Sequence, residues 1–127
     1  MIEKYIQVIT TIDSKKKAME ITKTVVSKRL CACAQIVGPI ISKYWWKNKL
    51  TTSKEWLCIM KTKKSLYTQL EAEIKKLHTY TVPEIIATSI IAGNKNYLDW
   101  IDKETKKQTD KRNWTQMNAD KQDKQNK

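Results

Sequence analysis

The residues best suited to chemistry lie in one short segment, His78 to Glu84. It places an imidazole, the phenol of Tyr80 and a carboxylate within seven residues, and Pro83 stiffens the backbone between them. Nitrogen and oxygen donors of this kind suit a borderline metal ion such as Cu(II). The segment therefore predicts a divalent-metal site with His78 and Glu84 as ligands and Tyr80 in the wall of a cleft.

The same segment also has a purely structural interpretation. His78 ends a predicted helix, so its side chain can interact with the last carbonyl groups of that helix. Tyr80 can pack against the core, and Glu84 can pair with a lysine. The sequence leaves both interpretations open, and its one histidine means that a single chain offers no pair of histidine ligands.

Catalytic motifs are not recognisable elsewhere in the sequence. With two glycines, the chain cannot form a glycine-rich phosphate loop, and it has no nucleophile elbow or paired carboxylates. We predict that it is not an enzyme. Its three cysteines, an odd number, fit a reducing compartment and are expected to be small core residues: Cys31, Cys33 and Cys58.

The composition of the chain indicates which kinds of partner it can bind and where in the cell it is expected. A net charge of +12 is compatible with binding of a nucleic acid. However, recognition of bases and phosphates favours the forked guanidinium of arginine, and of the 25 basic residues only Arg29 and Arg112 are arginines. We expect a solvated, lysine-rich surface. No stretch approaches the ~20 apolar residues of a membrane span, and the first residues lack the apolar run of a signal peptide. The expected location is the cytoplasm.

A long β-hairpin from Cys31 to Thr62 is expected to organise the fold. Both arms are rich in β-branched and aromatic residues, and Lys47-Asn48 forms the two-residue turn. Without a bulge, Cys58 would lie opposite Val37. The tip carries three aromatic residues that should project beyond a small domain and contact a partner chain, namely Tyr44, Trp45 and Trp46.

The remaining elements surround this hairpin. A strand is expected from Tyr5 to Thr11, a helix capped by Asp13 or Ser14, a second helix capped by Thr62, a strand from Glu84 to Ile91 and a short helix after Gly93-Asn94. The order is ferredoxin-like, βαββαβ plus a terminal helix, in the α+β class. Right-handed crossovers put both long helices on one sheet face, so the other face should favour self-association.

The domain is expected to span residues 1–102. Residues 103–127 hold eight basic and four acidic residues, with Trp114, Met117 and Ala119 as the apolar ones. This composition predicts a Lys-rich, polar C-terminal tail.

Blocks of residues spread along the domain carry a family resemblance. They occur in the order Thr10-Thr11, Leu30 to Cys33, Tyr44 to Lys49, Lys61-Thr62, His78 to Ala87 and Gly93 to Ile101. This series resembles the CutA divalent-ion tolerance family over most of the chain. The resemblance implies a tight homotrimer with hairpins packed between subunits, and a cytosolic role in tolerance of divalent metals, copper in particular. It also implies intersubunit clefts similar in shape to those of the PII signalling proteins.

The resemblance assigns roles to individual residues. It implies a divalent metal ligand, with Cu(II) the first candidate. Bacterial relatives credited with copper binding use a cysteine and a His-His pair where this chain has Thr10 and Leu77-His78, so only His78 carries over. The implied cleft-lining residues are Tyr80, Lys61, Tyr97 and Trp100, and those of the trimer interface are Tyr44, Trp45 and Trp46.

Two other functions stay open. A four-stranded βαββαβ sheet with aromatic residues and positive charge can stack RNA bases, although the first strand lacks paired aromatics. A purely structural trimer whose partner binds the tail is the other alternative.

Overall fold

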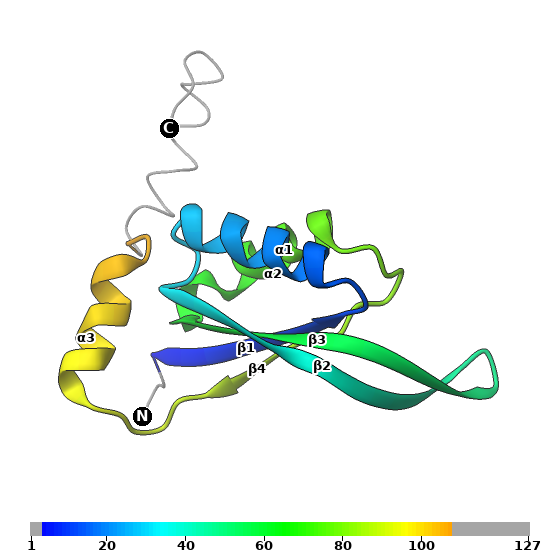
Figure 1. Ribbon diagram of the computed structural model, residues 1–127. Coiled ribbons are helices and arrows are strands. Elements are labelled where there is room, and N and C mark those ends of the chain that lie inside the picture. Colours follow the sequence, from blue (N-terminus) through cyan, green and yellow to red (C-terminus); the bar gives the residue numbers. More distant parts are fainter. Residues whose placement is uncertain (1–3, 108–127) are drawn as a thin grey trace, which may run out of the picture.

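A computed structural model describes residues 4–107 and confirms the ferredoxin-like arrangement. Four antiparallel strands form one sheet in the order β2-β3-β1-β4, with α1 and α2 on one face (Figure 1). The elements are β1 Tyr5–Ile12, α1 Lys15–Ser27, β2 Cys33–Trp46, β3 Lys49–Lys63, the 3₁₀ helix η1 Lys64–Leu66, α2 Tyr67–Leu77, β4 Ile85–Ser89 and α3 Lys95–Glu104.

The hairpin of β2 and β3 extends beyond the rest of the sheet (Figure 1). Its turn residues, Lys47 and Asn48, have φ angles of 50° and 64°, as a two-residue hairpin turn requires. A bulge between Val37 and Ile40 shifts the register, so Cys58 lies opposite Ile36. The pairing with Val37 was predicted for a hairpin without a bulge, and this one extra residue in β2 shifts it to Ile36.

One face of the sheet and the two long helices enclose the core. The buried side chains alternate along β1, as in Ile6, Val8 and Ile12, because every second residue of a strand points to the same face. They meet buried residues of the two helices at helical spacing: Ala18, Ile21, Val25, Leu70 and Ile74. This packing fixes α1 and α2 against the sheet.

The helix ends confirm one predicted cap and correct another. Ser14 caps α1 by accepting a hydrogen bond from the Lys17 backbone N–H at 3.1 Å. Thr62 does not cap the second helix. It is fully buried in β3, where its hydroxyl donates to the Leu30 carbonyl at 2.7 Å, and a 3₁₀ turn intervenes before α2.

The cysteines are free, as predicted. Cys31 and Cys58 are buried in the core, and burial raises their pKa values to about 12 and about 11. Cys33 is the exception. It lies on the other face of the sheet, with its Sγ 3.7 Å from the Tyr97 hydroxyl.

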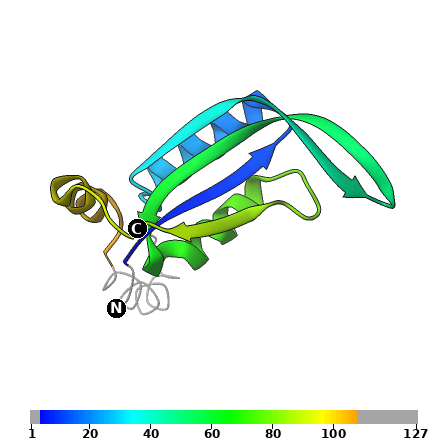
Figure 2. The same ribbon diagram turned by 90° about the horizontal axis from the view of Figure 1, so that it is seen from below.

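The second sheet face is not covered by helices α1 and α2, as predicted (Figure 2). Val37 and Ile86 on this face are 46% and 49% exposed, and the aliphatic residues between them are half-buried. A face of this kind suits contact with another chain.

The C-terminal part is described only to residue 107. Helix α3 runs to Glu104, two residues beyond the predicted end of the domain, and Thr105 is buried. The rest of the predicted Lys-rich tail, residues 108–127, lies outside the described residues. Between residues 4 and 107, no helix is long and apolar enough to cross a membrane.

Candidate functional site

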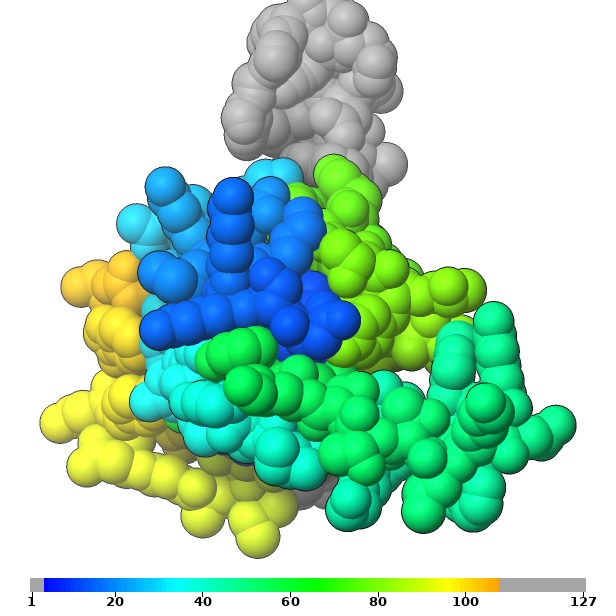
Figure 3. Space-filling view, turned by 45° about the vertical axis from the view of Figure 1, so that its right-hand side comes forward, coloured from blue at the N-terminus to red at the C-terminus, as the bar shows by residue number. Residues whose placement is uncertain are grey.

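A cavity of about 790 Å³ lies between the hairpin and the loop that follows α2. In Figure 3 these two segments adjoin on the right, the hairpin in blue-green and the loop in yellow-green. The hairpin and its base supply aromatic and acidic side chains, and the loop supplies a phenol and a carboxylate. The lining of the cavity includes Thr11, Tyr44, Trp45, Trp46, Glu55, Tyr80 and Glu84.

Glu55 is the most buried charged group in this cavity. It is 5% exposed, and its Oε2 accepts a hydrogen bond from the Tyr80 hydroxyl at 2.6 Å. Burial, and then the hydrogen bond and charge of Glu55, raise the pKa of Tyr80 well above its usual range. Tyr80 therefore stays protonated and acts as a hydrogen-bond donor.

His78 connects the end of α2 to β1 and to the next residues of its own loop. Its Nδ1 accepts a hydrogen bond from the Tyr80 backbone N–H at 3.1 Å, so the proton of the neutral ring is on Nε2. Nε2 lies 2.8 Å from the Thr11 carbonyl, to which it donates. Both nitrogens are thus engaged by backbone groups. The structural interpretation placed the ring against a carbonyl at the end of the helix, and the ring instead contacts the Thr11 carbonyl of β1.

Glu84 is exposed at the cavity. Its Oε1 lies 3.5 Å from the Thr11 hydroxyl, at the limit of a hydrogen bond, and no described lysine or arginine forms an ion pair with it. The structural interpretation predicted an ion pair between Glu84 and a lysine, and the described residues do not form this pair.

The donor set of one chain does not fit a divalent metal ion. Within the described part of the chain, no three residues of the His, Cys, Asp and Glu types lie close enough together to hold a metal. His78 has no uncommitted ring nitrogen, and Glu84 is one carboxylate. The roles of these two residues as metal ligands remain a prediction.

Three of the predicted cleft-lining residues lie away from this cavity. Lys61 is on the open sheet face, where its Nζ donates to Gln35 Oε1 at 2.7 Å. Tyr97 and Trp100 stack on each other in α3, with ring centroids 5.5 Å apart. Only Tyr80 of the predicted four lines the cavity, so a cleft that includes the others would have to form between copies.

The hairpin aromatics do more than the sequence suggested. We predicted Tyr44, Trp45 and Trp46 at a trimer interface, and in one chain they already form a wall of the cavity. Trp45 remains 71% exposed, so it can also contact another chain.

Sequence reasoning missed Glu55 and Thr11. In the sequence Glu55 is one of several polar residues that alternate along the strand. It is also the acidic residue of β3, and it lies where the aromatic tip of the hairpin begins. The available signal was the hairpin register, which pairs Glu55 with Ile40, just beyond the bulge. Its contact with Tyr80 joins residues 25 positions apart and required the tertiary structure.

The open sheet face does not favour the RNA-binding alternative. Base stacking on such a sheet uses aromatic residues on its two central strands. In β1 and β3 the central positions of this face are aliphatic: Ile9, Leu57 and Ile59.

Comparison with known proteins gives a consistent set of relatives. The family model described as "CutA1 divalent ion tolerance protein" matches residues 6–104. The "Divalent-cation tolerance protein CutA" of Thermus thermophilus is 40% identical over 98 residues, which is 77% of this chain and 95% of the relative. Its solved structure, a "Divalent cation tolerance protein (Cut A1)", matches with a TM-score of 0.79 at 38% identity, covering 80% of this chain and 99% of that one.

A plant relative differs in length. "Protein CutA 1, chloroplastic" of rice is 40% identical over 101 residues, which is 80% of this chain but 57% of the rice protein. The chain therefore spans a little over half of that relative, whose name places it in the chloroplast.

Proposed function

Because the chain belongs to the CutA1 divalent ion tolerance family, we propose that it binds or responds to a divalent metal ion, with copper as the first candidate. The proposed role is binding in a PII-like signalling context rather than catalysis. Relatives are named as tolerance proteins, and the family model carries the same description.

The proposed working form is a homotrimer. Two features support it: the uncovered sheet face around Val37 and Ile86, and the hairpin tip with its exposed Trp45. Apolar surfaces of this extent are costly in water, and a second and third copy would bury them.

The observation that carries the metal proposal is the position of Glu84. Its carboxylate is exposed at a cavity whose other wall is the aromatic hairpin tip, the part of the chain proposed to meet a neighbouring copy. Because one chain supplies too few ligands, the metal is proposed to bind where donors from different copies come together. His78 would then act by holding the loop against β1 rather than by ligating the ion.

The assembly is tested first, by light scattering at low micromolar concentration with and without Cu(II). One chain is 14.9 kDa, and the expected particle has three times this mass in both conditions. A monomer would contradict the proposal.

Copper titration by calorimetry then tests the residues. Glu84→Gln should weaken copper binding at least tenfold, because it removes the negative charge and keeps the shape. Glu20→Gln is the matched control, since Glu20 pairs with Lys17 on the outer surface of α1. His78→Ala should keep the affinity of the native protein if the ring is not a ligand. A large loss in this variant, with the trimer intact, would restore His78 as a ligand.

A further inference from the structure

The two acidic groups of the cavity lack cationic partners in a strongly basic protein. The chain has 25 basic residues, and these pair with five of the described acidic residues, namely Glu20, Glu73, Asp99, Asp102 and Glu104. Within residues 4–107, neither Glu55 nor Glu84 has an ion-pair partner. The cavity therefore holds two glutamates without an ion-pair partner among the described residues, on a protein of net charge +12.

Glu55 makes this arrangement costly for the empty protein. A carboxylate that is 5% exposed has lost most of its hydration, and a hydroxyl from Tyr80 replaces only part of it. Asp13 lies near enough for its charge to contribute to the raised pKa of Tyr80. A cation in the cavity would offset this concentration of negative charge.

The aromatic residues indicate what kind of cation fits. Tyr44, Trp45, Trp46 and Tyr80 line the same space, and aromatic faces attract ammonium groups and cover aliphatic carbon. Lys43 also lines the cavity, but its Nζ donates to Thr52 Oγ1 at 3.1 Å. At about 790 Å³ the cavity has the size of a small-molecule site and is far larger than the ligand shell of one metal ion.

We propose that this cavity binds a linear aliphatic polyamine, with ammonium groups donating hydrogen bonds to Glu55 and Glu84 and the methylene chain lying against the aromatic hairpin tip. Ammonium N–H groups suit the carboxylates better than a quaternary ammonium, which has no proton to donate. The inference does not depend on the binding of a divalent metal, and it requires that the cavity stays open when copies of the chain assemble.

The test is calorimetric titration of the full chain with spermidine at moderate salt, in the presence of EDTA to remove divalent metals. We expect saturable binding in the native protein and a loss of affinity of about tenfold in each of Glu55→Gln and Glu84→Gln. Because the protein and the amine are both cationic, non-specific attraction is weak and saturable binding is informative. Glu20→Gln should bind as the native protein does.

A second ligand and a second variant sharpen the result. Choline should bind at least tenfold more weakly than spermidine, and Trp46→Leu should weaken spermidine binding several-fold. Light scattering and far-UV circular dichroism confirm that each variant keeps its fold and assembly. The proposal is overturned by the absence of saturable binding, as would occur if a neighbouring copy fills the cavity, by equal binding of choline, or by native affinity in both glutamate variants. A failed copper titration leaves it intact.

Discussion

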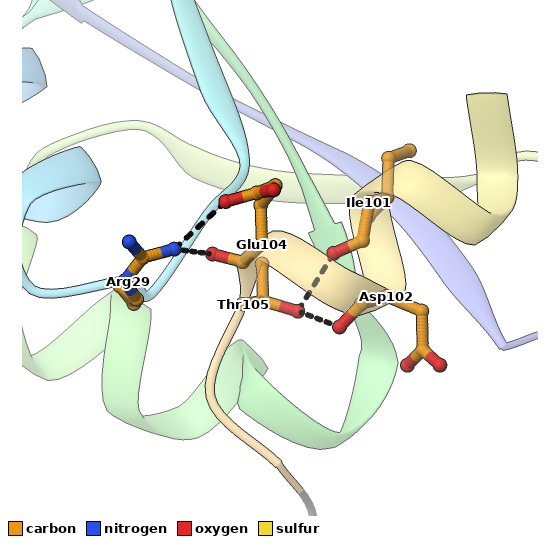
Figure 4. Close-up of polar contacts among 5 residues, drawn as sticks. All are labelled: Arg29, Ile101, Asp102, Glu104 and Thr105. Carbon is orange, nitrogen blue, oxygen red and sulfur yellow. Dashed lines mark hydrogen bonds and ion pairs between the residues drawn. The ribbon is translucent and has the colours of Figure 1, made fainter.

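Acidic residues at the two ends of the sheet differ in whether they form ion pairs. At the end where α3 packs, Asp102 pairs with Lys63 and Lys4 at 3.2 and 3.5 Å. Figure 4 shows Arg29 donating to both the carboxylate and the backbone carbonyl of Glu104. At the hairpin end, Glu55 and Glu84 have no such partners among the described residues.

We interpret the paired acidic residues as stabilising the fold and the unpaired ones as available to bind a ligand. The Lys63 side chain is 4% exposed, and its ion pair with Asp102 joins β3 to α3. Burial alone would raise the pKa of Asp102, but the hydrogen bond and charge of Lys63, together with Lys4, lower it. Glu55 is as buried but is met by a neutral hydroxyl, which leaves its charge uncompensated.

The largest effect is expected where the paired end is broken. Asp102→Asn leaves the buried Lys63 without a counter-charge, and we expect a loss of about 2–3 kcal/mol in the free energy of unfolding. This is below the value for a fully buried pair because Asp102 is 37% exposed. Urea denaturation measures it. The control is Asp99→Asn, whose pair with Lys95 is fully exposed and should contribute far less to stability.

The next effect concerns the base of the hairpin. A Cβ atom at Gly38 would lie 2.5 Å from Trp56 Cδ1 and 3.1 Å from its Cα, so Gly38→Ala forces the bulge or the ring to move. We expect a loss of about 2 kcal/mol by urea denaturation. At Gly93 a Cβ atom would meet only the Leu98 side chain, at 3.2 Å, so Gly93→Ala should have a smaller effect. Equal losses would mean that the Gly38 contact is relieved easily.

The sharpest comparison uses the same chemical change at the unpaired end. Glu55→Gln removes an uncompensated buried charge and keeps an oxygen for the Tyr80 hydroxyl. We expect the stability to be unchanged or to rise by about 1 kcal/mol, opposite in sign to Asp102→Asn. A loss as large as that of Asp102→Asn would show that Glu55 holds the fold, and the contrast between the two ends would fail.

The smallest effect is a pH dependence of the paired end. Because the folded-state pKa of Asp102 is lowered below its ordinary value of 3.8, its contribution to stability is complete above that value. The contribution is lost as the pH falls through the folded-state pKa. Urea midpoints of the native protein and Asp102→Asn should therefore differ by a constant amount above pH 3.8 and converge as the pH falls below that value. A difference that stays constant as the pH is lowered well below 3.8 would contradict the assignment.

Local patterns in the sequence determined most of the fold. The strand predicted from Tyr5 to Thr11, the Ser14 cap and the Lys47-Asn48 turn each depend on residues close together in the chain, and the structure confirms them. The exception was Thr62, a good capping residue by type. The structure instead buries it in β3, because its hydroxyl meets the Leu30 carbonyl, 32 positions away.

Only the tertiary structure decided the candidate site. The sequence identified His78, Tyr80 and Glu84 as a group, but it could not show that His78 is committed to the Thr11 carbonyl and the Tyr80 backbone. It also could not show that Glu55 accepts a hydrogen bond from the Tyr80 hydroxyl, 25 positions away. An acidic residue forms an ion pair only if the fold brings a lysine or arginine close to it, often from a distant segment of the chain. The composition gives only the number of charged residues.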